Sequence, residues 1–529
     1  MRMPFLKRGA PAVPAAPAAD YAPAPGRGQR RRGFWLSAAA GMFKASQVKE
    51  NDRWPAIPVS PDVFISTRQQ ILVARSREQW SNNDYVRGYV RRCRQNIVGE
   101  HGVKLHSRVV KKNGKADSQA VKAIEAAHAE WSEPGNCDVT GKLSWRHLQG
   151  LAIEHAVRDG EFIFRKIRGD NGGKFGFALQ VIDPQRLPIK YEQTRWGENG
   201  NFVRQGIEFS RFGKPIAYHF SSVDEWDDYF YNFAGQGFIR VPADEIIHGF
   251  VTEMAGQRRG IPWTSTGLFR MHHLQGFEDA AVQNARASAT KMGFIKYREG
   301  TGPELDDDAD VAGSIEAESL SFHELPEGAE LDKFDPQYPS GEFAVFTKAM
   351  VRGAATGWGV SYNSLANDLE GVNFSSIRDG KQDERDNWKE LQAWLIETLI
   401  RPVFREWLAQ ALLRGLVVTN GGKPLAAHRL NDYLDAHFQG RRWPWIDPKS
   451  DATGKVTEIR AGLNSPSNVI RESGKEPNRV YEEIAEDIEL MKAAGIPEQF
   501  IMVMMGLLPA PEPSTFKGDE SVAKEPEPA

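Results

Sequence analysis

The fold is decided by residues 338–413, which read YPSGEFAVFTKAMVRGAATGWGVSYNSLANDLEGVNFSSIRDGKQDERDNWKELQAWLIETLIRPVFREWLAQALL. Residues 342–356 predict a short helix that stops at Gly357 and Gly359. Residues 361–373 are rich in Asn, Ser and Gly and predict a loop. From Ser375 onward, apolar side chains recur every three or four positions, which predicts a helix with one apolar face. They are Trp388, Leu391, Leu395, Leu399, Val403 and Trp407.

The helix predicted from Ser375 is long. Ser375 and Ser376 are candidates for its N-cap. Pro402 is expected to kink this helix without ending it, because the apolar pattern continues beyond the proline. About 40 residues at about 1.5 Å each would span about 60 Å, a length typical of assemblies.

Length, charge and cysteine content narrow the class of protein. The chain has 529 residues, enough for several domains, and its 67 basic residues nearly balance its 70 acidic ones. This balance argues against wrapping of nucleic acid by a polycation. Two cysteines, Cys93 and Cys137, suit a reducing compartment better than a disulfide scaffold. The longest apolar run, residues 500–508, is about half of the roughly 20 residues that span a bilayer, so no membrane-spanning helix is predicted.

Both ends of the chain have the composition of disordered tails. Residues 1–53 are Ala/Pro-rich and basic, and residues 509–529 are rich in Pro and Glu. Arg30-Arg31-Arg32 followed by a short apolar run resembles a twin-arginine export signal, but Lys44 closes the run early. A disordered basic tail is therefore the preferred interpretation of residues 1–53.

Residues from about 54 to 255 predict an α+β domain with an antiparallel sheet. Residues 54–77 show a mixed pattern, whereas helices are predicted at 82–98, 117–131 and 144–158. Strands are predicted at 103–110, 161–167, 178–182, 206–210, 216–220 and 245–251, with a hairpin turn at Gly213-Lys214-Pro215. The arginines on the 82–98 helix could contact phosphate, but the preferred interpretation is that these arginines are solvated or paired with carboxylates.

The second half of the chain is mainly helical with one acidic insert. A helix of about 45 Å is predicted over residues 263–292, at about 1.5 Å per residue. Residues 301–330 hold ten acidic side chains and no Lys or Arg, which favours a solvated insert or a surface that does not hold DNA. Further helices are predicted at 450–461, 467–471 and 479–494.

Motifs for catalysis, cofactor binding and metal binding are not found. The sequence contains no GxxxxGK[ST], no HExxH and no GxSxG. The adjacent His272 and His273 do not share a helix face, and His147 and His155 are eight residues apart. We therefore predict no enzyme, no catalytic residue, no cofactor and no metal ligand. Two alternatives stay open: a nucleic-acid-processing enzyme with an unrecognised carboxylate site, and an adaptor that binds a capsid or motor partner without forming a pore.

Six phrases in fixed order resemble one family. They are YVRGYVRRCRQNIVGEHG, DGEFIF, QVIDPQRLP, GIEFSRFGKPIAYHF, VPADEIIHGF and GVSYNSLANDLEGVNFSSIRDG, followed after the long helix by Trp445-Ile446-Asp447-Pro448. Each phrase alone is weak, but together, over residues 54–489, they resemble the lambda-type portal proteins of bacteriophages.

The resemblance implies a mechanical function. Such proteins form rings, usually of twelve copies, at one capsid vertex, and double-stranded DNA is packaged through the ring by a terminase and later ejected. The implied partners are further copies of the chain, the terminase large subunit, head-completion or connector proteins, tail proteins, and the major capsid and scaffold proteins, with DNA bound non-specifically and no membrane. A role in initiating head assembly is also implied. The implied location is the virion, with the host cytoplasm during assembly.

The resemblance also divides the chain into parts of a portal-like α+β fold. These parts are a tail (1–53), a wing (54–262), a stem helix (263–292), a clip (293–338), a second stem helix (339–360), a tunnel loop (361–374), a long kinked helix that returns to the wing (375–440), a helical crown (441–508) and a second tail (509–529). The loop residues expected to face the DNA channel are Asn363, Asn367, Asp368, Glu370 and Asn373. Carboxylates in the loop and the acidic insert would repel phosphate, as a channel for sliding DNA requires.

Overall fold

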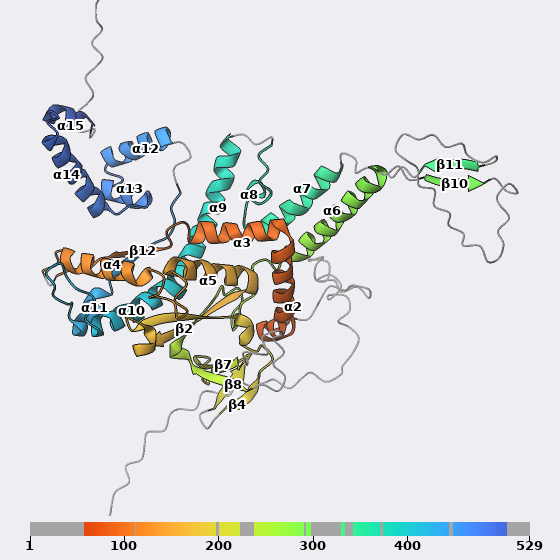
Figure 1. Cartoon of the computed structure of the whole chain (residues 1–529), viewed down its shortest axis with the longest axis horizontal. Helices are drawn as coiled ribbons and strands as arrows, with labels where there is room; N and C mark the ends of the chain where they lie inside the picture. The colour runs from red at the N-terminus through yellow and green to blue at the C-terminus, as the bar shows by residue number, and fades with distance from the viewer. Residues whose placement is uncertain are drawn as a thin grey trace, which may run out of the picture. The chain divides into compact units, whose positions relative to one another are not determined.

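The computed structural model describes most of the chain between residues 58 and 504. The described ranges are 58–111, 113–196, 200–222, 237–289, 293–297, 329–333, 342–370, 374–443 and 448–504. The predicted tails at residues 1–53 and 509–529 lie outside them, as do residues 301–328 of the acidic insert. The described elements combine helices with antiparallel sheets (Figure 1). The protein therefore has the α+β class that its sequence predicts.

Polar caps define the helices at the beginning of the described chain. These helices are α2 (Pro61–Asn82), α3 (Asp84–Ile97), α4 (Ser118–Ser132) and α5 (Trp145–Asp159). Asn83, Asp117 and Ser144 accept backbone N–H groups at the starts of α3, α4 and α5, which confirms the three predicted helices. α5 ends at Gly160, where φ is +92° and a Cβ would lie 2.5 Å from the Ile261 backbone.

The sequence pattern missed helix α2. Its buried side chains are Ile65, Gln69, Val73, Ser76 and Gln79. Because three of these five are polar, the face that packs inward carries only a weak hydrophobic periodicity. The sequence of residues 61–77 therefore shows no helical periodicity, although these residues form part of one continuous helix.

Two antiparallel sheets form the β part of the described chain. The first has the order β3-β2-β9 and contains β2 (Glu161–Arg168), β3 (Phe177–Ile182) and β9 (Ile246–Phe250). The second runs in chain order through β4 (Gln193–Trp196), β5 (Asn201–Arg204), β6 (Ile207–Phe209), β7 (Pro215–Ser221) and β8 (Phe238–Pro242). The predicted hairpin is confirmed as β6–β7. Strands β4, β5 and β8 were missed, since each has only four or five residues and no clear alternation.

The long helix predicted from Ser375 consists of three segments. They are α9 (Phe374–Leu395), a π-helical stretch (Ile396–Ile400) and α10 (Arg401–Leu413). The prediction that Pro402 does not end the helix is confirmed, but the irregularity is a π-helical stretch just before the proline, which has no N–H for the α-helical ladder. The predicted N-cap is wrong, because α9 begins at Phe374 and both Ser375 and Ser376 lie inside it.

The apolar face of this helix is the centre of the main core. Trp388, Leu395, Leu399, Val403 and Trp407 are each at most 1 % exposed, as the pattern predicts. The Trp407 ring lies 5.9 Å from the ring of Trp131 on α4, between ring centroids. The indole N–H of Trp131 in turn donates to the Phe177 carbonyl on β3 at 2.9 Å. The long helix thus joins the helical layer to the first sheet.

A pair of helices flanks the acidic insert. α6 (Leu268–Ala289) leads into β10 (Gly293–Tyr297), which pairs antiparallel with β11 (Ala329–Lys333) before α7 (Glu342–Gly357). α6 and α7 lie side by side in Figure 1 and contact each other. The predicted start of α6 at residue 263 is wrong. Residues 263–267 form turns, in which the N–H groups of Ser265 and Gly267 donate to carbonyls three residues back, at 3.0 Å each, and not four.

Short elements complete the described chain. β1 (Lys104–Ser107) pairs with β12 (Ala436–Gln439), which follows the short helix α11 (Leu430–Tyr433). The predicted C-terminal helices are confirmed as α12 (Pro448–Arg460), α13 (Pro466–Glu472) and α14 (Pro477–Ala493), and α15 (Glu498–Met504) is additional. Both cysteines are free and buried. Within the described ranges, no helix combines the length and apolar character needed to cross a bilayer.

A buried ion pair fastens the first sheet to the chain that leads toward α6. Arg259 and Glu161 are 1 % and 0 % exposed, and the Arg259 Nη2 lies 2.5 Å from the Glu161 Oε1. Glu161 also accepts the Gly260 N–H at 2.8 Å and faces the His248 Nε2 at 3.0 Å. Burial alone would raise the pKa of Glu161, but the Arg259 charge and the bonds from His248 and Arg259 lower it to about 2.

Glu161→Gln is expected to destabilise the protein by about 3–5 kcal/mol, because it leaves Arg259 buried without its counter-charge. The depressed pKa of Glu161 means that its contribution is present above its ordinary value of 4.5 and is lost as the pH falls toward about 2. Urea unfolding followed by tryptophan fluorescence at pH 7 and pH 3 measures both effects. The control is Asp244→Asn, whose side chain is 72 % exposed in an ion pair with Arg168. Equal unfolding free energies for the two variants would contradict the assignment.

Candidate functional site

The candidate site is the connection between α7 and α9. The sequence predicts a loop over residues 361–373, and this prediction is partly wrong, because Tyr362–Ala366 form the short helix α8. Ser361 caps α8 by accepting the Ser364 N–H at 3.2 Å, and Leu365 is buried beneath it. Asn367 ends α8 in the left-handed conformation with φ +54°, which Asn tolerates better than most residues. Within the described part of this connection, the backbone without helical structure after α8 is therefore limited to residues 367–370.

One side of the connection is held by α9. The Glu384 carboxylate on α9 is 8 % exposed and accepts the hydroxyls of Ser361 at 3.0 Å and Ser364 at 2.8 Å. Asn387, one turn further along α9, donates to the Gly359 carbonyl at 2.9 Å. Because hydrogen bonds to a charged acceptor are the stronger kind, Glu384 fixes the start of α8 on α9.

The other side is held by α7 through Asp368. Its carboxylate accepts the Tyr362 hydroxyl at 2.9 Å and the Lys348 ammonium group of α7 at 3.2 Å. The Glu370 N–H also donates to Asp368, at 2.9 Å. These bonds lower the pKa of Asp368, with the Glu370 N–H as the largest cause. Burial and the bond to Asp368 raise the pKa of Tyr362 to about 12, so the phenol stays protonated and donating.

The base of the α6–α7 pair is built around Trp358. Its indole N–H donates to the Thr264 carbonyl at 3.1 Å, and its ring stacks on Tyr89 of α3 at 4.7 Å. A Cβ on Gly267 would lie 2.5 Å from this ring, so only glycine lets the start of α6 approach it. The connection at residues 359–370 leaves this junction directly.

Comparison with known proteins supplies the family. The family model described as "Phage portal protein, lambda family" matches residues 47–392, which is more than half of the chain. The chain belongs to the lambda family of phage portal proteins. The matched region begins before α2 and ends inside α9, so it contains the α6–α7 pair and the whole of the 359–370 connection.

Curated relatives extend this match along the chain. The "Probable portal protein" of Halomonas phage phiHAP-1 is 36 % identical over 505 residues, covering 94 % of this chain and 95 % of that protein. "Portal protein B" of Escherichia phage lambda is 20 % identical over 465 residues, covering 80 % of this chain and 84 % of that protein. Among solved structures, the neck of an empty GTA particle has a TM-score of 0.40 and 14 % identity over 78 % of this chain and 94 % of that chain. A similarity of that size carries no argument about the assembly of this portal protein.

The structure places four of the five loop residues predicted from the sequence. Asn363 is half-buried on α8, Asn367 is exposed at its end, Asp368 is half-buried, and Glu370 is exposed. Asn373 lies outside the described residues. The expectation that Asp368 acts as a free repulsive charge needs revision, because Lys348 neutralises it. Glu370 is the carboxylate that the described part of the loop exposes to solvent.

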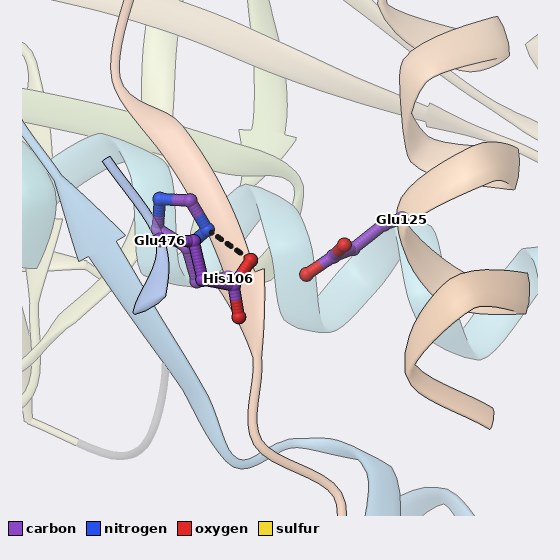
Figure 2. A group of neighbouring side chains, drawn as sticks. All are labelled: His106, Glu125 and Glu476. Atoms are coloured by element: carbon purple, nitrogen blue, oxygen red, sulfur yellow. Dashed lines mark hydrogen bonds and ion pairs between the residues drawn. The ribbon is translucent and has the colours of Figure 1, made fainter. Parts of the chain in front are cut away.

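Two features of this portal protein are not evident from its sequence. Leu369, between Asp368 and Glu370, is 63 % exposed, an unusual position for a large apolar side chain in a loop that otherwise looks polar. The structure also brings His106, Glu125 and Glu476 together (Figure 2), although they are far apart in the sequence and no metal ligand was predicted. No spacing rule connects residues from a strand, a helix and a distant helix cap, so only tertiary structure reveals this group.

Asp368→Asn is expected to loosen the connection, because the neutral amide loses its ion pair with Lys348 while keeping an acceptor for Tyr362. Hydrogen–deuterium exchange at residues 361–370 should become several-fold faster, with α7 and α9 unchanged. Glu370→Gln is the matched control and should exchange like the wild type, since its exposed carboxylate lies outside the contact with α7. Equal exchange in both variants would show that Asp368 does not hold the loop.

Proposed function

We propose that this protein is the portal of a phage head: a ring at one capsid vertex through which double-stranded DNA is packaged by a terminase and later ejected. The observation that carries the proposal is the family match over residues 47–392, with a portal relative covering 94 % of the chain. The family is a structural one, which agrees with a mechanical role in which ATP is hydrolysed by a separate motor.

The surface of the α6–α7 pair supports assembly into a ring. Five large apolar side chains on these two helices are solvent-exposed in the single chain: Phe269 (71 %), Phe277 (38 %), Val282 (51 %), Val345 (70 %) and Phe346 (45 %). Soluble monomers rarely expose that much apolar surface on one feature, and such surface usually marks a contact with a partner. In a ring, the partner is the next copy of the same chain, and each copy offers the same two helices.

The same two helices connect the ring contact to the loop. Phe277 on α6 packs on Phe343 and Phe346 of α7, at 5.3 and 4.9 Å between ring centroids. Lys348, two residues after Phe346 on α7, binds Asp368 of the loop. A change in the packing between neighbouring α6–α7 pairs would therefore move α7, and α7 would move the loop through the contact between Lys348 and Asp368.

The exposed tip of the loop suits contact with sliding DNA. Every Lys or Arg that neutralises a phosphate strengthens binding and makes it depend on salt, which would hold the duplex in place. The exposed tip carries Asn367, Leu369 and Glu370, which offer no positive charge. We propose that this tip faces the channel and touches DNA without gripping it.

The acidic insert is proposed to dock other proteins. β10 and β11 pair at its two ends and bring residues 297 and 329 together. Residues 301–330 carry ten acidic side chains and no basic ones, so a docking partner with a basic surface would fit. We assign the insert (293–338) to the clip, which binds the terminase large subunit and later the head-completion, connector and tail proteins.

The remaining parts of the chain receive roles by the same proposal. Residues 54–262 form the wing, 263–292 and 339–360 the stem, 361–374 the tunnel loop, 375–440 the long helix and the return to the wing, and 441–508 the crown. We further propose twelve copies per ring, contact with the major capsid and scaffold proteins, initiation of head assembly, and residence in the virion after assembly in the host cytoplasm.

Val345→Asp is expected to prevent ring assembly, because it buries a charge in the contact between neighbouring α6–α7 pairs. Mass photometry of the purified full chain should shift from a large oligomer to the single chain, with an unchanged circular dichroism spectrum. Phe212→Asp is the control, since Phe212 is 82 % exposed in the β6–β7 turn of the wing. If Val345→Asp assembles as well as the wild type, neighbouring copies do not contact each other through the α6–α7 pair as proposed.

Glu370→Lys is expected to slow DNA packaging, because a ring of added positive charges at the loop tip would bind phosphate. The rate measured in a packaging reaction with purified heads and motor should fall several-fold and recover partly as the salt concentration rises. Glu253→Lys, which adds the same charge on an exposed segment after β9, should package normally. Normal packaging by the Glu370→Lys portal at low salt would argue against a channel position for the loop.

A further inference from the structure

Three side chains form a cluster where the start of α14 lies near β1 and α4. His106 lies on β1, Glu125 on α4, and Glu476 at the cap position just before α14 (Figure 2). Their ligand-type atoms all lie within 4.8 Å of one another. The three side chains come from elements separated by up to 370 residues, so the cluster exists only when these elements are docked.

The geometry of the cluster suits a small divalent cation. The His106 Nδ1 lies 3.2 Å from the Glu476 Oε2. Two ligands bound to zinc at about 2.0–2.1 Å in a tetrahedral arrangement lie about 3.3 Å apart, so this pair already has the spacing of one tetrahedral edge. Figure 2 shows the Glu125 carboxylate pointing toward the same place from the other side.

Glu125 is oriented by a bond outside the cluster. The Glu125 Oε1 accepts the backbone N–H of Ser107 at 2.9 Å, which fixes its carboxylate beside the strand that carries His106. Such supporting bonds hold ligands in place in natural metal sites. The His106 Nε2 makes no hydrogen bond within the described part of the chain, so it can carry the ring proton while Nδ1 binds a cation.

The charges of the cluster favour a cation between the two carboxylates. Glu125 and Glu476 are both half-buried carboxylates. The nearby Arg479 donates its Nε–H to Glu483 at 3.2 Å. Two half-buried carboxylates that share one histidine therefore lack a full counter-charge of their own, and a divalent ion would supply it.

Solvent can reach the cluster. His106, Glu125 and Glu476 line one cavity of about 860 Å³. The cavity leaves room for water to complete the coordination of a metal that has three protein ligands. One imidazole and two carboxylates, with no thiolate, suit zinc or manganese better than a soft metal ion.

We propose that His106, Glu125 and Glu476 bind one divalent transition-metal ion, zinc being the best fit, which clamps the start of α14 to β1 and α4 of the wing. The clamp is independent of the proposed ring and channel. Its consequence is that metal availability sets how firmly the C-terminal helices are held.

The first test is zinc binding by the full-length protein after chelator treatment and transfer to metal-free buffer. Isothermal titration with zinc chloride should show one ion per chain. Glu125→Gln removes one ligand but keeps an acceptor for the Ser107 N–H, and it should weaken binding by at least about tenfold. His106→Gln should have the same effect and decides the question if the first variant does not fold.

The matched control is Glu482→Gln. Glu482 is 56 % exposed and pairs with Lys122 at 3.2 Å, across the same contact between α14 and α4, but lies outside the cluster. This variant should bind zinc like the wild type. Hydrogen–deuterium exchange shows where the zinc ion binds. In the wild type and in Glu482→Gln, zinc should slow exchange in β1 and in the first turns of α14. In Glu125→Gln, zinc should leave the exchange rates of these segments unchanged.

Two results would overturn the proposal. The first is a wild-type protein that binds no zinc at one ion per chain. The second is equal zinc binding by the wild type, Glu125→Gln and His106→Gln, which would place the ion elsewhere in the chain. In either case, the contact between His106 and Glu476 is a hydrogen bond without a metal.

Discussion

The Trp358 indole lies where α3, α6 and α7 converge, and the placement of the other functional parts depends on how it is held. It is 4 % exposed, stacks on Tyr89, and donates to Thr264 just before α6. Gly267 provides the space for the ring because it has no Cβ. With this junction fixed, α6 and α7 leave the core as a pair, and the 359–370 connection begins one residue after the tryptophan.

Polar contacts hold the loop that leaves this junction in place on α7 and α9. Glu384 and Asn387 hold it on α9, and Lys348 holds Asp368 on α7. The anchor on α7 is an ion pair between partly exposed side chains, so it is weaker than the aromatic core below it. A loop that is anchored at both sides and exposed only at its tip would suit the proposed channel, in which it has to yield to a passing duplex and then return.

The elements that could be predicted from the sequence are those defined by residues close together in the chain. The Trp388–Trp407 stripe, the helices predicted at 82–98, 117–131 and 144–158, and the β6–β7 hairpin follow from spacing and turn chemistry, and the structure confirms them. The prediction failed at three places: α2 buries polar side chains, residues 263–267 form turns before α6, and Asp368 is neutralised by Lys348. The cluster of His106, Glu125 and Glu476 was beyond sequence reasoning for the same reason.

We propose that the chain forms a closed ring with the 361–370 connection at its opening. Single-particle cryo-electron microscopy of the purified full chain tests it most directly, because one map gives both the symmetry and the position of the loop. We expect a symmetric ring with a hole wide enough for a DNA duplex, α6 and α7 of neighbouring copies in contact, and Glu370 facing the hole. A monomer, an assembly without a central opening, or a ring whose 361–370 connection lies on its outer surface would contradict it.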